Sequence, residues 1–315
     1  MEKDKKIYIA GHQGMLGSAL LRALKKHGYS SIITATRHEL DLTNQNDVVN
    51  FLDYHKPHQV IIAAAKVGGI HANKTYPADF IYENLMIQNN IIHAAWQSNV
   101  KNLIFVGSNC AYPVNCQQPM KEEYLLTGFL EPTNEAYAIA KIAGIKMCEN
   151  YRRQYGVNFF SAIPCSLYGP YDNFDLMNSH VVPGLIRKLH EAKLQNQDEM
   201  ILWGTGKPQR ELMYVDDAAE GLVFLMQKGC EDYYINLGTG HDYTIAELAH
   251  SIAGVIGYQG QIKFDISYPD GMPKKLLDSQ KIILKGWLPK VSLDIGFRLT
   301  YEFFLSQCEK NLEHA

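Results

Sequence analysis

Tyr137 and Lys141 are four positions apart, a spacing that could place a phenol beside an ammonium group. If this stretch is helical, the two side chains lie one turn apart on the same face. A free phenol has a pKa near about 10, and a neighbouring cation lowers it toward the range in which the group exchanges protons at neutral pH. The chain has 19 tyrosines, so this spacing also arises by chance and needs support from the surrounding elements.

The composition indicates a globular protein and excludes several classes of partner. The chain has 315 residues, of which 46% are hydrophobic and 20% are charged, enough for one large domain or two smaller ones. Its formal net charge of -3 argues against nucleic acid as the main partner. The apolar run at 7–10 is too short for a signal peptide core or a membrane span, so we expect no membrane association and a cytoplasmic location.

Six cysteines are scattered along the chain without a Cys-x-x-Cys pair. This spacing argues against a structural zinc site and against a redox-active dithiol. We therefore expect no metal site, and free thiols in a reducing compartment. A free cysteine is by default a small buried apolar residue.

A glycine-rich turn near the N-terminus has the surroundings of a dinucleotide-binding site. A buried strand is expected at 7–10 and a helix at 18–27, so strand, turn and helix occur in the required order. Gly11 permits a tight turn, Gly14 lets a pyrophosphate approach the backbone, and Gly17 allows close helix packing. The alternative is an ordinary glycine-rich loop. The cofactor-binding residues expected in this turn are Gly11, Gln13, Gly14, Met15, Leu16 and Gly17.

Alternating strands and helices predict an α/β fold with a doubly wound, parallel Rossmann-type sheet. Further strands are expected at 32–36, 58–63, 102–106 and 159–164. Ligands of such a sheet bind beyond the carboxyl ends of its strands, the edge at which Ser108 is expected. The alternation loosens after residue 165. We therefore expect a nucleotide-binding domain at 1–165, to which segments around 211–240 return, and a smaller, discontinuous α/β substrate-binding domain mainly at 166–315.

The glycine spacing resembles that of the extended, sugar-nucleotide-modifying branch of the short-chain dehydrogenase/reductase superfamily. This resemblance implies that Ser108, Tyr137 and Lys141 act together in reducing a ketone. Tyr137 would protonate the ketone oxygen, Lys141 would lower the tyrosine pKa and hold the nicotinamide ribose, and Ser108 would hydrogen-bond the carbonyl. A purely structural role for Tyr137 and Lys141 is the alternative.

Arg37 follows the second expected strand, where enzymes that prefer NAD commonly carry an acid. A guanidinium group there suits a 2′-phosphate, so we expect NADP(H) as the cofactor. A solvated surface arginine is the alternative. The resemblance adds to the cofactor site Asp41, Leu42, Ala63, Ala64, Ala65, Tyr137, Lys141 and His180.

Four segments narrow the resemblance to the GDP-L-fucose synthase family, and it extends over nearly the whole chain. They are 108–113, 131–135, 178–183 and 269–275. Members of this family epimerise GDP-4-keto-6-deoxy-D-mannose at C3 and C5 and reduce its 4-ketone. The ketone acidifies the hydrogens at both carbons, and inversion needs a base and an acid. The resemblance implies that Cys110 is the base and His180 the acid.

Two other functions remain open at this point. Cys110 could be a packing residue and His180 could make an ordinary hydrogen bond; the enzyme would then be a 4-reductase of a related GDP-6-deoxy-4-keto sugar or heptose, without epimerase activity. A nucleotide-binding scaffold without catalysis is the second alternative. Because the extended branch is often dimeric, we also expect a homodimer.

By resemblance, a further set of side chains binds the GDP-sugar substrate. Lys188 and Ser166 stand where an arginine and an asparagine are usual, departures that affect substrate affinity or sugar choice more than reaction class. For the charged members, a solvated surface position is the alternative. The expected substrate-binding residues are Arg187, Lys188, Trp203, Arg210, Lys274, Lys275 and Asp278.

Overall fold

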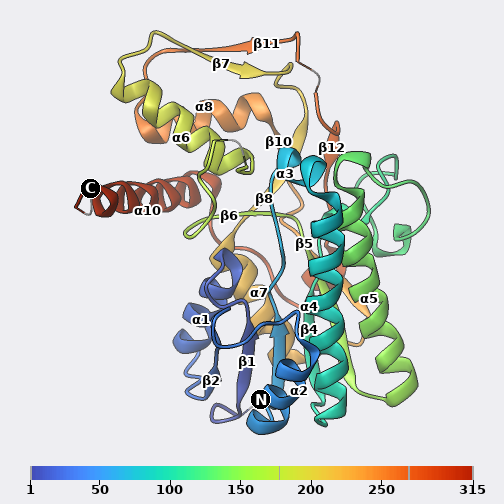
Figure 1. Ribbon diagram of the computed structural model, residues 1–315. Helices are drawn as coiled ribbons and strands as arrows, with labels where there is room; N and C mark the ends of the chain where they lie inside the picture. Colours follow the sequence, from blue (N-terminus) through green and yellow to red (C-terminus); the bar gives the residue numbers. More distant parts are fainter. Residues whose placement is uncertain (1, 177, 269, 314–315) are drawn as a thin grey trace.

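A six-stranded, fully parallel sheet forms the larger part of the protein (Figure 1). The computed structural model describes residues 2–176, 178–268 and 270–313; Pro269, which opens one of the four motif segments, lies outside them. In spatial order the strands are β2 (Ile32–Ile33), β1 (Ile7–Ala10), β3 (Gln59–Ile62), β4 (Asn102–Val106), β5 (Asn158–Pro164) and β9 (Tyr234–Leu237).

Helices cover both faces of this sheet, which confirms the doubly wound α/β prediction (Figure 1). The central strands are continuous buried apolar runs, as expected for strands covered on both sides. One face carries α1 (Met15–Lys26) and α7 (Val215–Lys228), which pack on each other. The other carries α2 (Gln45–His55), α4 (Pro77–Gln97) and α5 (Glu135–Tyr155).

Strand β2 is shorter than predicted, because the chain leaves the sheet after Ile33. It is an edge strand that pairs only with β1. The Thr36 amide donates a hydrogen bond of 2.7 Å to the Glu39 carboxylate, which stabilises a turn instead of a longer strand. The expected strand to Thr36 is therefore wrong at its end, and Arg37 lies in this turn.

A second, smaller part is organised around β8 (Gln209–Tyr214). This strand pairs with β6 (Ser166–Tyr168), β10 (Asp242–Thr244) and β12 (Lys274–Lys275), while β7 (Glu199–Trp203) pairs separately with β11 (Gln261–Asp265). A second hydrophobic core joins these strands to the surrounding helices. Those helices are α6 (Val181–Leu194), α8 (Ile245–Ile256) and α10 (Leu293–Glu313). Two short helices, α3 (Ile70–Thr75) and α9 (Gln280–Leu284), complete the fold.

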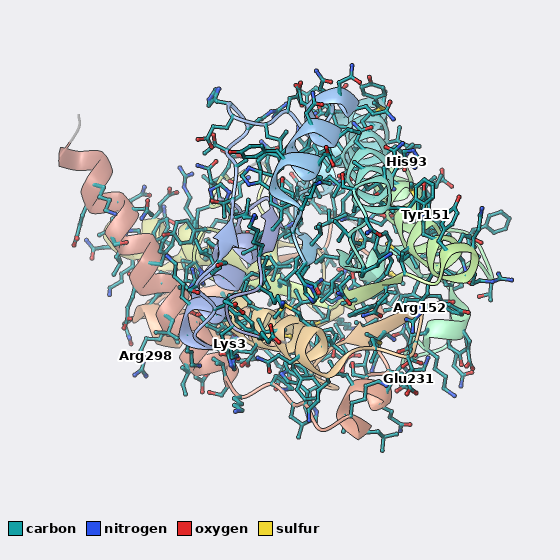
Figure 2. All side chains as sticks on the ribbon, turned by 90° about the horizontal axis from the view of Figure 1, so that it is seen from below. Lys3, His93, Tyr151, Arg152, Glu231 and Arg298 are labelled. Atoms are coloured by element: carbon teal, nitrogen blue, oxygen red, sulfur yellow. The ribbon has the colours of Figure 1, made fainter. Side chains whose placement is uncertain are left out.

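Polar contacts at the lower end of α5 hold this long helix in place (Figure 2). The His93 ring nitrogen of α4 lies 2.6 Å from the Tyr151 hydroxyl of α5. Arg152 donates hydrogen bonds of 2.8 and 3.1 Å to the carbonyls of Cys230 and Asp232, just before β9. These contacts matter for the site because the other end of α5 carries Tyr137 and Lys141.

Candidate active site

Ser108, Tyr137 and Lys141 meet at the carboxyl end of β4, where α5 packs closely on the sheet. Gly144 permits this close packing, because a Cβ atom there would lie 2.5 Å from a ring carbon of Phe105 in β4. The buried Lys141 ammonium donates a hydrogen bond of 2.9 Å to the Val106 carbonyl and lies 5.7 Å from the centre of the Tyr137 ring. The helical spacing therefore does place the lysine beside the phenol, as predicted.

Ser108 links the end of β4 to the phenol. It caps the short 3-10 turn η1 (Asn109–Ala111), and its hydroxyl oxygen accepts a hydrogen bond of 3.2 Å from the Cys110 amide. The hydroxyl is also hydrogen-bonded to Tyr137. The serine hydroxyl has one proton and two lone pairs, so it can donate to the phenol oxygen while accepting from the Cys110 amide.

The pKa of Tyr137 is shifted in the direction opposite to the one expected from a neighbouring cation alone. Burial is the largest effect on this phenol and raises its pKa, the charge of Cys110 raises it further, and only the Ser108 hydrogen bond lowers it. Burial likewise lowers the pKa of Lys141 to about 8, so the lysine is still mostly protonated at neutral pH. A phenol that keeps its proton at neutral pH is suited to donating that proton to a developing alkoxide.

Cys110 lies at the same end of β4, and its sulfur contacts groups from three segments. Asn134 donates a side-chain N–H to the Cys110 sulfur at 3.2 Å, and the Lys275 ammonium lies 3.7 Å from that sulfur. Cys110 lies close enough to Tyr137 and Arg210 that a charge on its sulfur would act on both. The expected base and the expected ketone-reducing phenol therefore share one site.

His180 stands immediately before α6, and the segment that precedes it packs against the loop after β3. The Gly69 amide donates a hydrogen bond of 3.0 Å to the Asn178 carbonyl. His180 is exposed as a whole residue, but neighbouring protein atoms reduce the hydration of its ring, which lowers its pKa. Its proton is therefore more acidic but less often present at neutral pH. Among the described residues, no hydrogen bond or ion pair joins His180 to Cys110.

The glycine-rich turn has a shape that fits a dinucleotide. Gly11 has a φ of +86°, and a Cβ atom on Gly17 would lie 2.0 Å from the Gly11 carbonyl oxygen. Helix α1 begins at Met15 with no side-chain cap and no acid in its first turn, which leaves its N-terminal N–H groups for an anion. Gln13 is exposed, whereas the Leu16 side chain is buried, so only the Leu16 backbone is left for a ligand.

The segment Ala63–Ala65 follows β3 directly and lies against this turn. Its residues are half-buried, and a Cβ atom on Gly11 would lie 2.7 Å from the Ala64 backbone. The small side chains of Ala63–Ala65 leave room beside the turn for a flat ligand.

Arg37 and Asp41 lie close together beyond β2. Arg37 is exposed, and its charge helps to lower the pKa of Asp41, although hydrogen bonds from Thr43 are the main cause. Leu42 is half-buried, and its carbonyl accepts a hydrogen bond of 3.0 Å from Asn90. An exposed guanidinium near the end of β2 fits a 2′-phosphate, while the neighbouring carboxylate fits a polar group of the adenosine.

Lys188, Trp203 and Arg210 lie in the smaller part of the molecule. The Lys188 ammonium is 5.5 Å from the centre of the Trp203 ring system, which stacks on Tyr268 with 4.4 Å between ring centres. Trp203 is 66% exposed, so the stacked pair offers a flat surface to a ligand. Arg210 donates a hydrogen bond of 2.6 Å to the Met272 carbonyl, which joins this surface to the segment that leads into β12.

Two of the expected substrate-binding residues have ionic partners within the protein. Arg187 donates hydrogen bonds to the Glu191 carboxylate at 2.8 Å and to the Phe174 carbonyl at 3.1 Å. The Lys274 ammonium lies 3.0 Å from the Asp242 carboxylate. To bind a phosphate, each of these cations would have to break its contact with the carboxylate or contact both groups at once.

Asp278 and Lys275 flank the turn that follows β12, and their contacts differ from those expected of nucleotide ligands. The Asp278 carboxylate accepts a hydrogen bond of 3.0 Å from the Gln280 amide, and its carbonyl accepts one from Asn236. Asp278 therefore stabilises the chain around the start of α9. Lys275 approaches the sulfur of Cys110.

Sequence reasoning missed three residues that shape the site. Asn134, which contacts Cys110, lay inside one of the motif segments but was given no role. Glu211 is fully buried and its carboxylate accepts hydrogen bonds from several backbone amides, including that of Leu277. An acid directly before the apolar residues Leu212 and Met213 was the available signal. Nothing in the sequence pattern indicated that Tyr268 stacks on the exposed tryptophan.

Known proteins share both this sequence and this fold. Residues 7–238 match the model of the NAD dependent epimerase/dehydratase family. A GDP-L-fucose synthase from Sinorhizobium fredii is 53% identical over 98% of both chains. The chain belongs to the GDP-L-fucose synthase family.

Two solved structures show the same fold with a bound nucleotide. MlghC, a GDP-mannoheptose C4 reductase from Campylobacter jejuni with NADP bound, superposes with a TM-score of 0.89 at 41% identity, covering 97% of this chain and 99% of that one. A GDP-L-fucose synthetase from Naegleria fowleri bound to NADP superposes with a TM-score of 0.88 at 27% identity, covering 98% and 96%.

The described residues contain neither a membrane-spanning helix nor a cluster of metal-binding side chains. No helix in that part of the chain is long and apolar enough to cross a bilayer. The same residues contain no group of three or more His, Cys, Asp or Glu side chains arranged to hold a metal ion. All six cysteines are free thiols.

Proposed function

We propose that this chain converts GDP-4-keto-6-deoxy-D-mannose into GDP-L-fucose, by epimerisation at C3 and C5 and NADPH-dependent reduction of the 4-ketone. The observation that carries the proposal is that a thiol with basic neighbours, Cys110, shares one site with the Ser108–Tyr137–Lys141 set. The 53% identity to a GDP-L-fucose synthase, against 41% to a GDP-mannoheptose reductase, favours this sugar.

The reduction uses the buried groups at the end of β4. NADPH, when bound, supplies the hydride that adds to the ketone carbon. Tyr137 donates its proton to the ketone oxygen, and Ser108 supplies a second hydrogen bond at that oxygen. Lys141 and Arg37 would hold the ribose and the 2′-phosphate of the cofactor, respectively, while the turn at Gly11 would cradle its pyrophosphate.

The epimerisation uses Cys110 and His180 on the carbons beside the ketone. The thiolate removes a proton from carbon, and the electron pair of the broken C–H bond moves onto the ketone oxygen as an enolate. His180 then delivers a proton to the opposite face, which inverts the carbon. His180 has to be protonated to act as this acid, and its lowered pKa makes it a stronger donor once it is.

The smaller part of the molecule would hold the GDP portion of the substrate. Arg210 is the candidate for a phosphate contact, because its guanidinium is positioned by the Met272 carbonyl beside the catalytic groups. Lys188 and Trp203 are candidates for the nucleotide end, where a charge lies over an exposed, stacked aromatic surface.

Product analysis in heavy water tests this proposal. The enzyme is incubated with GDP-4-keto-6-deoxy-D-mannose and NADPH in deuterated water, and the product is examined by NMR. We expect GDP-L-fucose labelled at both C3 and C5. A reduced sugar that carries no deuterium and has unchanged stereochemistry would instead identify a reductase without epimerase activity. Absence of NADPH oxidation would reject both enzymatic functions.

We also propose that the chain forms a homodimer and works in the cytoplasm. Tyr82 on α4 and Ile139 on α5 are 63% and 41% exposed, on two helices that pack side by side. Six free thiols fit a reducing compartment. Light scattering should give twice the mass of one chain, and Tyr82→Glu should shift the protein toward the monomer. A monomeric wild-type protein would contradict the dimer.

A further inference from the structure

Lys274 and Lys275 are neighbours in sequence but have different partners. They form β12, in which successive side chains point to opposite faces. The Lys274 ammonium lies 3.0 Å from the Asp242 carboxylate, whereas the Lys275 ammonium lies 3.7 Å from the Cys110 sulfur. Among the described residues, Lys275 forms no ion pair with a carboxylate, so its charge is directed at the thiol.

The closer polar contacts of the Cys110 sulfur are both to donors. The Asn134 side-chain N–H lies 3.2 Å from the sulfur, and the Lys275 ammonium lies 3.7 Å from it. The remaining contact, 3.9 Å to the Asn109 side-chain oxygen, is the long one and is the only one in which the sulfur would donate. Two donors, one of them charged, stabilise a thiolate more than a thiol.

The register between β8 and β12 places a second cation next to Lys275. Lys275 is paired directly with Arg210, so the two cations stand side by side on neighbouring strands. Like charges in such a pair repel each other and are destabilising. Arg210 donates to the carbonyls of Gln209 and Met272, and the charge of Cys110 acts on it favourably. A thiolate beside both cations offsets their repulsion.

We propose that Lys275, together with Asn134, holds Cys110 as the thiolate that removes a proton from the carbon beside the ketone. This inference rests on the proposed function. In the step, the C–H bond breaks, an S–H bond forms, and the electron pair of the C–H bond becomes an enolate on the ketone oxygen. Lys275 neither gives nor takes a proton. It acts through Cys110 and is therefore a positioning residue, a different role from the nucleotide contact expected from the sequence.

Several hydrogen bonds position the backbone that carries Lys275. The Leu276 amide donates a hydrogen bond of 2.9 Å to the Gln118 side chain, and the Leu277 amide donates one of 2.8 Å to the buried carboxylate of Glu211. Glu211 also accepts hydrogen bonds from the amides of Thr239 and Gly240. The two residues that follow Lys275 are thus both held by hydrogen bonds, which fixes the backbone from which the lysine reaches the thiol.

Alkylation of Cys110 by iodoacetamide, followed by mass spectrometry of the individual cysteine peptides, tests this inference without the sugar substrate. The thiolate is the reactive form, so its population sets the rate at neutral pH. In the wild-type protein, Cys110 should react at least about tenfold faster at pH 7 than Cys116, whose thiol pKa is raised by burial. Equal rates would overturn the inference without any variant.

Substitution of the two lysines supplies a matched comparison. Lys275→Met should slow Cys110 alkylation at pH 7 by about tenfold or more and leave the rate at pH 10 unchanged, because the thiolate then forms without help. Lys274→Met should not change either rate, and Lys275→Arg should restore most of the rate at pH 7. If Lys275→Met reacts like the wild type at pH 7, the proposed role of Lys275 is wrong.

The enzymatic consequence is measured separately. Deuterium exchange into GDP-4-keto-6-deoxy-D-mannose at pH 7 should fall about tenfold in Lys275→Met and recover toward pH 10. Circular dichroism and NADPH binding check the fold, and Lys275→Gln replaces the methionine variant if that protein is unfolded. If wild-type enzyme shows no exchange but the alkylation pattern holds, the proposed function fails while the thiolate site stands.

Discussion

The reducing and epimerising groups of this enzyme begin two residues apart, at Ser108 and Cys110, yet their surroundings differ. Lys141 is buried and Tyr137 half-buried where α5 packs on the large parallel sheet, and loss of hydration is the largest cause of the pKa shift of both. Cys110 instead faces cations from the smaller part of the molecule. The difference separates the two halves of the site: burial raises the pKa of the Tyr137 phenol, whereas the Cys110 sulfur faces the Lys275 ammonium from the smaller part of the molecule.

Tyr137→Phe gives the largest expected effect. Removal of the proton donor should lower the rate of ketone reduction by roughly 1,000-fold, measured as NADPH oxidation, because general acid catalysis contributes on that order. Exchange of the carbon-bound hydrogens should continue, since Cys110 is intact. Tyr155→Phe, an exposed tyrosine on the same helix, is the control and should behave like the wild type. If Tyr137→Phe reduces the ketone at the wild-type rate, Tyr137 is not the proton donor of the reduction.

Cys110→Ser should have the complementary effect. Deuterium incorporation at C3 and C5 should fall by roughly 100-fold, because a hydroxyl is a far weaker base than a thiolate at neutral pH. NADPH-dependent reduction of the unepimerised ketone, with Tyr137 as the proton donor, should remain measurable. The control is Cys116→Ser, which lies outside the site. Unchanged deuterium incorporation in Cys110→Ser would show that another group removes the proton.

Arg37→Ala tests the cofactor end of the reducing half. Loss of charge-assisted hydrogen bonds to the 2′-phosphate should raise the KM for NADPH by about 30-fold, while the KM for NADH should change little. The ratio of kcat/KM for the two cofactors is the measurement. If both cofactors are affected equally, the exposed guanidinium has a role other than recognising the 2′-phosphate.

Stability as a function of pH tests how strongly burial acts on Lys141. Its folded pKa of about 8 lies below the ordinary value of 10.5, so between these values the unfolded chain binds a proton that the folded chain does not. This group therefore raises the free energy of unfolding as the pH rises, by about 1.5 kcal/mol from pH 8 to pH 9.5.

Lys141→Met provides the reference for that measurement, because buried cysteines titrate in the same range with the opposite sign. Urea unfolding of both proteins at the two pH values gives the difference due to Lys141. An equal change in both proteins would mean that the folded lysine keeps an ordinary affinity for its proton.

Most of the framework was predictable from local patterns. The apolar run at 102–106 is a strand in the structure with the predicted bounds, and the glycine turn does separate a strand from a helix. The strand that begins at Ile32 was predicted to end at Thr36 but ends at Ile33. The prediction was too long because β-branched residues favour a strand even where the edge of a sheet offers no further partner.

The sequence by itself determined that Tyr137 and Lys141 share a helix face and that Ser108 follows a strand, because the periods of helices and strands are local properties. Tertiary structure decided the charges of these groups. Burial of the phenol, which opposes the expected direction of its pKa, depends on how α5 packs on β4. Likewise, only the register of β12 on β8 determines that Lys275, and not Lys274, faces Cys110.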